Sequence, residues 1–353
     1  MQTIGIDCRF ASTRSGLGRY TRSLVQHLLA IEDPASFILF VRSRSDTWLD
    51  CIPKGTQIIS APYPHYSVRE QIALPSLIRK SKCSLFFSPH FTVPLFCPVP
   101  FVATIHDLIL HRYPNQAGPV KRLAYLFLMR STVRHARRLI AVSAFTAGEI
   151  ASCYGRISAD KITVIPEGVD PLFHAEPPQR LADVRRRYRI AHPFFLYVGN
   201  AKEHKNVQML IDAFHDAWKS EMTLVLVMEG REAEHLRLGE QVTVLNDLPD
   251  EDLPALYSAA RAFVTASLYE GFCLPILEAL ACDCPVIAPA LSAIPEIVEK
   301  SGAVLIEPTM EALSSALRSP PMKTPGILAR ERYAWDLTAR ETLAVLHTAS
   351  SLM

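Results

Sequence analysis

The sequence predicts an α/β protein with two domains, each built on a parallel sheet. The chain has 353 residues, more than one hydrophobic core usually supports. Strand-like apolar runs alternate with helical patterns along its length, as in parallel βαβ units. A charged segment containing Pro177-Pro178 interrupts this alternation, and a second α/β series begins at Phe194. We therefore expect two Rossmann-like domains joined by a linker.

The first domain is expected at residues 1–170. Short runs rich in Ile, Val and Phe predict its strands near residues 3–8, 37–41, 57–60, 84–87, 101–105, 138–142 and 162–165. Apolar periodicity predicts helices between them at Gly18–Ala30, Val68–Lys80, Val120–Arg137 and Ala144–Cys153.

A linker is expected at residues 171–192, followed by a second domain at residues 193–329. The strand pattern resumes at Phe194–Gly199, and further strands are expected at Leu224–Met228, Val242–Leu245, Ala262–Thr265, Val286–Ala288 and Ala303–Ile306. Residues 330–353 are expected to form a last helix, centred on Arg330–His347.

Composition indicates an ordinary globular protein, with 49% hydrophobic and 20% charged residues. The apolar stretch Leu85–Ile105 contains four prolines, which excludes a membrane-spanning helix. The eight cysteines of the chain lack the spacing of zinc ligands or redox pairs. The N-terminus runs directly into a predicted strand. We expect a cytoplasmic protein without a signal peptide, a metal or a nucleic-acid partner.

Charge differs between the two halves. Residues 1–180 contain 21 Lys and Arg against 12 Asp and Glu, whereas residues 181–353 contain 16 against 23. A basic first half suits an anionic lipid surface or a diphosphate-bearing acceptor. Basic residues from Lys121 to Arg138 alternate with apolar ones, which is typical of a helix lying on a membrane. An ordinary surface helix with a basic outer face is the alternative, and both stay open.

The segment Tyr269–Ala279 contains two glutamates, Glu270 and Glu278, separated by seven residues. An apolar strand precedes it, and Pro275 suits the first turn of a helix because proline has no N–H to leave unpaired. The free N–H groups at such a helix start can bind an anion. Two carboxylates beside an anion site predict a ligand with hydroxyls and phosphate, such as a nucleotide sugar.

A second phosphate-type loop follows the first strand, at Ser15 to Tyr20. Gly16 and Gly18 allow a close approach of the backbone to phosphate at a helix N-terminus. A dinucleotide site would need a third glycine, but Thr21 stands at that position. It would also need an acidic residue after the second strand, where the chain has Arg42-Ser43-Arg44. NAD binding is therefore disfavoured.

The segment from Glu270 to Glu278, with Gly-Phe-x-Leu-Pro between the glutamates and Cys284-Pro285-Val286-Ile287 after them, resembles the E-x7-E signature of family 4 retaining glycosyltransferases. The resemblance spans nearly the whole chain and implies the GT-B fold, in which two Rossmann-like domains face a cleft. It also implies that the second domain binds the donor and the first domain the acceptor, and that the last helix, with Arg330–His347 as the candidate, crosses back to the first domain.

The resemblance implies roles for individual residues. Glu270 would contact hydroxyls of the donor sugar, and Glu278 the ribose hydroxyls. Lys205 would pair with the donor diphosphate, and His106, in Ile105-His106-Asp107, would bond a sugar hydroxyl near the reacting carbon. Backbone N–H groups around Phe272, Cys273 and Leu274 would hold phosphate.

Further donor contacts follow from the same resemblance. Gly16 and Gly18 would approach the diphosphate, and Leu248 belongs to the loop that abuts the base. Asn200 stands where many members have arginine, and Lys202 is a candidate replacement for that charge.

Two positions depart from the family pattern. Cys273 and Asp283 stand where glycine is usual, and a positive φ there would cost about 1 kcal/mol or more. The turn Ile165–Asp170 also matches the family, and we interpret it as mostly structural.

These features predict a metal-independent, retaining hexosyltransferase acting in cell-surface polysaccharide assembly on a glycan or lipid-linked acceptor. Gly5-Ile6-Asp7-x-Arg9 and the Val198–Asn206 segment resemble the branch rich in mannosyltransferases, so GDP-mannose is the favoured donor. UDP-glucose, UDP-N-acetylglucosamine and dTDP-rhamnose stay open. The alternatives are a sugar-nucleotide epimerase of the same fold and a catalytically silent sugar-nucleotide binding module.

Overall fold

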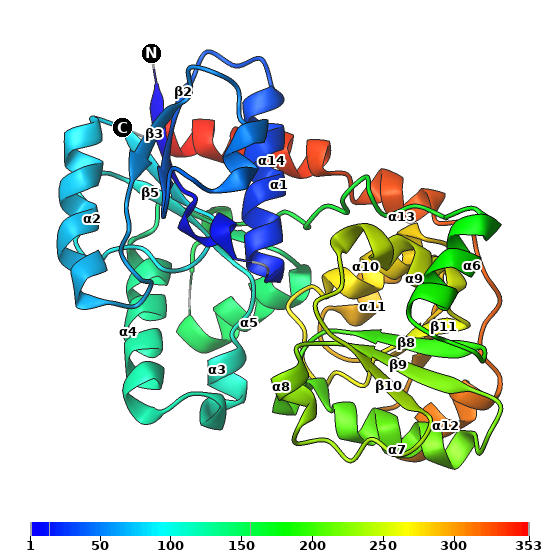
Figure 1. The fold of residues 1–353 in the computed structure, drawn as a ribbon. Helices are drawn as coiled ribbons and strands as arrows, with labels where there is room; N and C mark the ends of the chain where they lie inside the picture. Colours follow the sequence, from blue (N-terminus) through cyan, green and yellow to red (C-terminus); the bar gives the residue numbers. More distant parts are fainter. Residues whose placement is uncertain (1, 14, 156, 352–353) are drawn as a thin grey trace. The chain divides into compact units, whose positions relative to one another are not determined.

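The computed structural model describes residues 2–13, 15–155 and 157–351. The chain divides into two units, each with its own parallel sheet (Figure 1). Unit 1 contains residues 1–168 and 334–353, and unit 2 contains residues 169–333. The last helix, α14 (Trp335–Ser351), therefore belongs to the first unit although it is encoded after the second.

Unit 1 contains a seven-stranded parallel sheet in the order β3-β2-β1-β4-β5-β6-β7. The strands are β1 (Thr3–Asp7), β2 (Ser36–Val41), β3 (Gln57–Ser60), β4 (Leu85–Ser88), β5 (Phe101–Ile105), β6 (Arg138–Ala141) and β7 (Ile162–Val164). The helices are α1 (Gly16–Ala30), α2 (Val68–Ser81), α3 (Ile109–Arg112), α4 (Pro119–His135), α5 (Ala144–Tyr154) and α14. Short 3-10 segments are η1 (Arg9–Ser12), η2 (Thr47–Cys51), η3 (Pro114–Gln116) and η4 (Ala159–Lys161).

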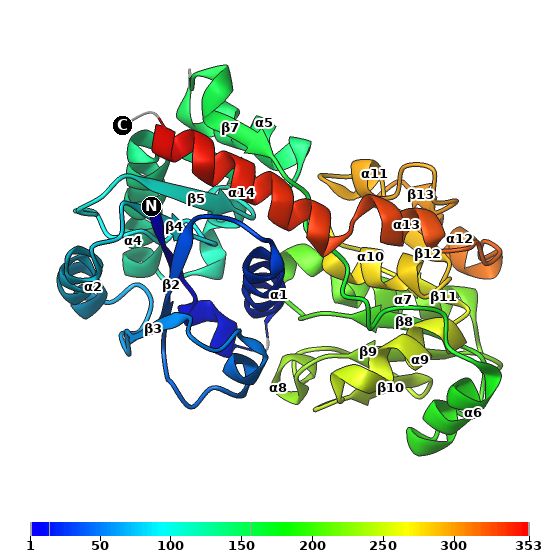
Figure 2. The same cartoon turned by 90° about the horizontal axis from the view of Figure 1, so that it is seen from above.

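Two hydrophobic clusters cover the faces of this sheet. One contains residues of α1 and α14, and Figure 2 shows these two helices next to each other. The other contains residues of α2, α4 and α5. The strands are buried on both faces, which explains why they are continuous apolar runs rather than alternating ones.

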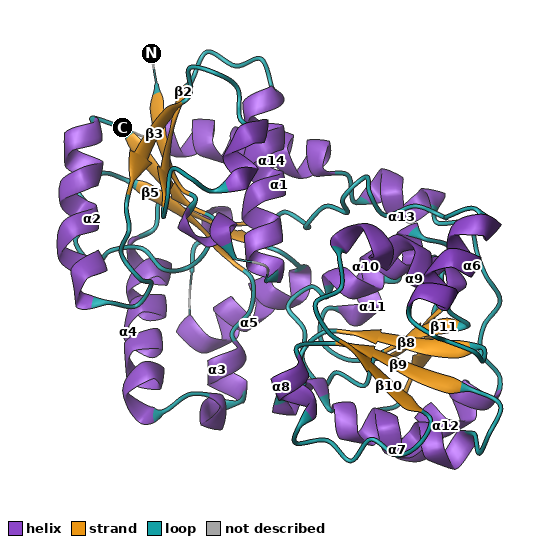
Figure 3. Ribbon diagram, viewed as in Figure 1, coloured by secondary structure: helices purple, strands orange, loops and turns teal. Residues whose placement is uncertain are grey.

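Unit 2 contains a six-stranded parallel sheet in the order β10-β9-β8-β11-β12-β13. Figure 3 shows β8, β9 and β10 of this sheet side by side. The strands are β8 (Phe194–Val198), β9 (Thr223–Val227), β10 (Val242–Leu245), β11 (Ala262–Val264), β12 (Val286–Pro289) and β13 (Val304–Ile306). The helices are α6 (Pro178–Arg187), α7 (Val207–Ala217), α8 (Gly230–Ala233), α9 (Leu253–Ala259), α10 (Leu274–Ala281), α11 (Ile294–Ile297), α12 (Met310–Arg318) and α13 (Ile327–Arg332). Two 3-10 segments, η5 (Glu203–Lys205) and η6 (Asp250–Asp252), complete the unit.

Each sheet has a topological switch point, where the strand order reverses direction. It lies between β1 and β4 in unit 1 and between β8 and β11 in unit 2. In open α/β sheets, ligands bind outside the carboxyl ends of the strands at this point. The loops after these four strands are therefore the places where the fold itself favours a site.

The structure refines three sequence expectations. α1 begins at Gly16 rather than Gly18, because Ser15 caps the helix by accepting from the Gly18 N–H. Residues 171–192, expected as a linker, include α6, whose first residue is Pro178. The expected last helix begins at Trp335, after the separate short helix α13. Within the described residues, no helix is both long and apolar enough to cross a membrane.

Candidate active site

Unit 2 brings Lys205 and Glu270 together at its switch point. Lys205 ends η5 in the loop after β8, and Glu270 lies in the loop after β11. The Lys205 Nζ donates to Glu270 Oε1 at 2.6 Å, and both side chains are largely buried. The lysine proposed to hold a diphosphate is thus paired with the glutamate proposed to contact the sugar.

The backbone of Glu270 is fixed by the neighbouring loop. Its N–H donates to the Ser292 hydroxyl at 2.9 Å, and its carbonyl accepts from the Ala293 N–H at 3.3 Å. Glu278 lies one turn inside α10, where it is buried and accepts from the Tyr257 hydroxyl at 2.9 Å. These bonds hold both carboxylates in place before any ligand is present.

The start of α10 has a left-handed backbone. Cys273, the residue before the helix, has φ 82°, and Asp283 after it has φ 56°. Both positions therefore have the positive φ that glycine adopts without strain, as the family pattern suggested. The Asp283 carboxylate accepts from the Gly326 N–H at 2.6 Å, which offsets part of the cost. Burial, followed by the charge of Glu270, raises the pKa of the Cys273 thiol well above its usual value, so this cysteine stays protonated.

The other residues expected near the donor also follow strands of this sheet. Asn200 and the exposed Lys202 lie after β8, and the Asn200 side chain accepts from the Lys202 N–H at 3.2 Å. Leu248 is half-buried in the loop after β10. Phe272 is buried, with its ring against Tyr333 at 5.8 Å between centroids, and Leu274 begins α10.

In unit 1, Gly18 has a packing role in addition to the one expected. A Cβ atom at this position would lie 2.1 Å from the Thr13 carbonyl oxygen, so no side chain fits there. Gly16 is exposed at the first position of α1. The glycine spacing of this loop thus has a structural explanation at Gly18, and the expected approach to a diphosphate stays a prediction.

His106 lies directly after β5, where its ring is held at both nitrogens. Nδ1 is 2.8 Å from Glu167 Oε1, and Nε2 is 2.9 Å from the Pro89 carbonyl oxygen. Both partners are acceptors, so the doubly protonated imidazolium satisfies both contacts. Burial lowers the pKa of His106, but the hydrogen bond and charge of Glu167 outweigh it, and the pKa is raised above its ordinary value.

Glu167 is the residue that sequence reasoning missed. The turn around it, Ile165–Asp170, was interpreted as mostly structural, yet its carboxylate sets the charge of the predicted active-site histidine. The pairing joins positions 61 residues apart, and only the order of β5, β6 and β7 brings them together. The sequence offered one indication of this role, because Glu167 follows β7 closely and therefore lies at the same edge of the sheet as His106.

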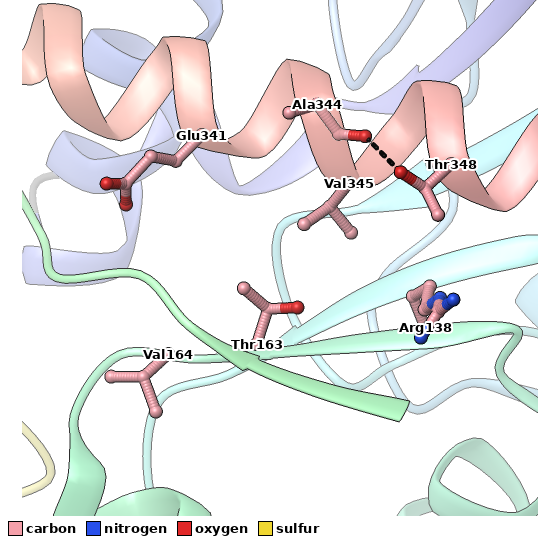
Figure 4. Close-up of a pocket in the computed structure, with 7 residues that line it drawn as sticks. All are labelled: Arg138, Thr163, Val164, Glu341, Ala344, Val345 and Thr348. Carbon is pink, nitrogen blue, oxygen red and sulfur yellow. Dashed lines mark hydrogen bonds between the residues drawn. The ribbon is translucent and has the colours of Figure 1, made fainter. Parts of the chain in front are cut away.

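A cavity of about 400 Å³ lies elsewhere in unit 1, between α14 and the strands β6 and β7 (Figure 4). Arg138, Thr163, Glu341 and Thr348 contribute its polar groups, and Thr348 donates to the Ala344 carbonyl at 2.9 Å. None of its lining residues is a predicted site residue, and no function is assigned to it.

The two parallel sheets, with the Lys205–Glu270 pair at the switch point of unit 2 and the His106–Glu167 pair at the carboxyl edge of the sheet in unit 1, define a protein of the GT-B class. A model described as Glycosyltransferase Family 4 matches residues 14–172, and one described as Glycosyl transferases group 1 matches residues 185–320. With both units matched, the chain belongs to the family 4, group 1 glycosyltransferases.

Individual relatives agree with this assignment. The chain is 27% identical over 338 residues to an O-antigen chain mannosyltransferase B of Escherichia coli, covering 85% of each chain. It is 29% identical over 257 residues, 66% of each chain, to a GDP-mannose-dependent phosphatidylinositol monomannoside mannosyltransferase of Mycolicibacterium smegmatis. Sucrose-phosphate synthase from Thermosynechococcus elongatus shares the fold, with a TM-score of 0.78, 21% identity and full coverage of both chains.

Proposed function

We propose that the protein is a retaining mannosyltransferase that transfers mannose from GDP-mannose to a glycan or lipid-linked acceptor in cell-surface polysaccharide assembly. The Lys205–Glu270 pair at the switch point of unit 2 carries this proposal, because it offers a cation for a diphosphate and a carboxylate for sugar hydroxyls. The mannosyltransferase relatives, one of them named as GDP-mannose-dependent, support the choice of sugar and base.

The chemistry follows from where charge develops during transfer. Departure of the nucleoside diphosphate builds negative charge, which Lys205 and the amides before α10 would stabilise without a metal ion. Glu270 would accept hydrogen bonds from the sugar, and Glu278 from the ribose. His106, as an imidazolium, would donate to a sugar hydroxyl in place of the Pro89 carbonyl. Retention of configuration would follow a front-face substitution.

A thermal-shift series with GDP-, UDP- and dTDP-sugars tests the donor site. A ligand present at 100 times its Kd stabilises the folded state by about 2.7 kcal/mol. We expect GDP-mannose to raise the melting temperature of the wild type and of Lys219→Ala, which removes an exposed lysine from unit 2. The same ligand should have no effect on Lys205→Ala. A larger melting-temperature shift with a UDP- or dTDP-sugar would contradict GDP-mannose as the donor. An equal shift in wild type and Lys205→Ala would contradict the Lys205 site.

Product analysis separates transfer from the alternatives. Incubation with GDP-mannose and a lipid-linked saccharide extract should release GDP and lengthen the saccharide by one mannose. An isomerised nucleotide sugar formed without acceptor would show an epimerase instead. Donor binding without any GDP release would show a silent binding module.

We also propose that α4 contacts the anionic inner face of a membrane. Val120, Leu123 and Phe127 recur at helical spacing with exposed fractions of 82%, 69% and 60%, and Lys121 and Arg122 are exposed beside them. An exposed apolar stripe flanked by cations is typical of helices that lie in a membrane interface. Leu126 and Met129, in contrast, pack into unit 1.

Vesicle sedimentation tests this contact. The wild type should sediment with phosphatidylglycerol vesicles at low salt and much less with neutral vesicles. Leu123→Ser with Phe127→Ser should abolish sedimentation, whereas a change at exposed Leu305 of unit 2 to Ser should not. Absence of wild-type sedimentation at low salt would refute the proposal.

A further inference from the structure

A row of aromatic rings lies at the carboxyl edge of the sheet in unit 1. Phe10 and His65 are stacked, with ring centroids 3.5 Å apart and planes at 6°. Phe10 also contacts His90 at 4.7 Å, and His90 lies 6.4 Å from His106. Tyr66 meets His90 edge-on at 6.4 Å. The rings thus run without interruption from the predicted active-site histidine to the segment before α2.

The row spans the topological switch point of this sheet. Phe10 follows β1 and His90 follows β4, the two strands between which the order reverses. His65 and Tyr66 arrive from the loop after β3. The rings therefore lie where parallel sheets bind ligands, and not at an arbitrary place on the surface.

A buried ion network holds the distal end of the row in place. Arg9, which is fully buried, donates to both carboxylate oxygens of Asp7 at 2.8 and 2.6 Å and to Glu70 at 2.6 Å. It also donates to the Tyr63 carbonyl at 3.4 Å, and Glu70 accepts from the Tyr66 N–H at 2.7 Å. The Asp7-x-Arg9 motif thus acts as a positioning element that ties the 63–70 segment to the end of β1.

Tyr66 occupies a position whose backbone favours a different residue. Its φ is 63°, in the left-handed region that glycine adopts freely and that a bulky side chain adopts only under constraint. Its side chain is nevertheless 39% exposed, so it contributes less to the core than a buried ring would. Strained backbone positions cluster at functional sites, so the left-handed Tyr66 beside the aromatic row is compatible with a binding role.

Two polar groups in the row are suited to bind hydroxyls. His90 Nδ1 accepts from the Thr92 N–H at 3.3 Å and lies 3.0 Å from the Thr92 hydroxyl, and with both groups donating to Nδ1 the proton of the neutral ring is on Nε2. Burial, with neighbouring positive groups, lowers the pKa of His90 well below its ordinary value and keeps it neutral. Among the described residues, neither the Nε2–H of His90 nor the Tyr66 hydroxyl has a hydrogen-bond partner.

Resting on the transferase function above, we propose that Phe10, His65, Tyr66 and His90 form the subsite that binds a pyranose ring of the saccharide acceptor. The C–H face of a sugar packs against aromatic rings, while its hydroxyls need convergent polar partners. Tyr66 supplies the exposed ring, and the Tyr66 hydroxyl and His90 Nε2–H supply the polar partners. The row leads to His106, so the bound sugar lies beside the proposed reaction centre.

Saturation-transfer NMR with methyl α-D-mannopyranoside at millimolar concentration tests this subsite on the full chain. The wild type should transfer saturation to the sugar, and Tyr66→Gly should reduce the signal at least fivefold. Phe96→Ala, which removes an 83% exposed ring of the same unit, should leave the signal unchanged. Tyr66→Phe, which keeps the ring without the hydroxyl, should fall between the wild type and Tyr66→Gly.

The variants are chosen so that unfolding cannot imitate the result. Glycine suits the left-handed backbone at position 66, which offsets part of the packing that Tyr66→Gly loses against His90 and Phe91, and saturation transfer is compared at a temperature where melting curves show both proteins fully folded. Its melting-temperature rise with GDP-mannose should equal that of the wild type, and this rise tests the proposed function separately. Equal saturation transfer in the wild type and Tyr66→Gly, or no transfer to the sugar at all, would overturn the subsite whatever the donor result.

Discussion

Replacing Glu167 by Gln should destabilise unit 1 in a pH-dependent way. The His106 Nδ1 and Glu167 Oε1 atoms are 2.8 Å apart, and the side chains are 16% and 7% exposed. At that distance the gross attraction of two unit charges is about 6 kcal/mol for an effective dielectric constant of 20. Desolvation of both groups opposes it, and hydrogen bonds to charged groups contribute about 1.5–3 kcal/mol net. We expect Glu167→Gln to lower the free energy of unfolding by this net amount at pH 5.5.

The pH dependence follows from the direction of the pKa shift. Glu167 raises the pKa of His106 in the folded state, so its stabilisation is complete below the ordinary histidine pKa of about 6.5. It is lost as the pH rises through the folded-state pKa. Well above the raised folded-state pKa the imidazole is neutral in both states, so the charge-dependent part of the difference between wild type and Glu167→Gln should disappear there.

Urea unfolding at pH 5.5 and pH 9 measures this difference. Tryptophan fluorescence reports on it, because Trp48 and Trp335 lie in unit 1. Glu149→Gln is the matched control: Glu149 is a largely buried carboxylate of the same unit, but it pairs with Arg112, which stays charged at both pH values. Its effect should change much less with pH than that of Glu167→Gln, since only the secondary influence of the Glu149 charge on His111 and Cys153 depends on pH. A pH-independent effect of Glu167→Gln, or none, would refute the assignment of an imidazolium at His106.

Three further predictions concern other charged or strained positions. Glu270→Gln should abolish transfer but tighten GDP binding several-fold in titration calorimetry, because the negative charge of Glu270 no longer competes with the diphosphate for Lys205; weaker GDP binding would contradict this. Cys273→Gly should raise the free energy of unfolding by up to about 1 kcal/mol, since relief of the left-handed strain exceeds the entropy cost of glycine; a clear destabilisation would show that the thiol is needed. Arg9→Lys should cost about 1–3 kcal/mol in urea unfolding, because one ammonium group cannot replace the guanidinium fork; unchanged stability would contradict the positioning role.

Strands and most helices could be predicted because local sequence determines them. Buried parallel strands are short apolar runs, and the seven expected in unit 1 match β1–β7 to within one or two residues. Helix boundaries were less accurate where capping decides them, as at Ser15 before α1. Pro177-Pro178 was interpreted as part of a linker, although proline at the first position of a helix is compatible with α6.

The pairings within the sites could not be predicted in the same way. Lys205 and Glu270 are 65 positions apart and meet only because β8 and β11 are neighbours in the sheet. Periodicity identifies strands but not their order, so both residues could be named as candidates without their ion pair. The positive φ at Cys273 and Asp283 was inferable because glycine is usual there, which is information about the backbone rather than about the side chain.

Both units neutralise their key cation before any ligand arrives. Lys205 is paired with Glu270, and His106 with Glu167, in each case by a largely buried carboxylate. A buried unpaired charge would be costly, so the pairing stabilises the free protein. It also sets a condition on the ligand, because an anion that binds Lys205 must replace or share the attraction of Glu270. A ligand that brings a diphosphate for the lysine together with hydroxyls for the glutamate satisfies both groups, whereas a simple phosphate leaves the carboxylate unpaired. The internal ion pair therefore favours a nucleotide sugar over phosphate alone.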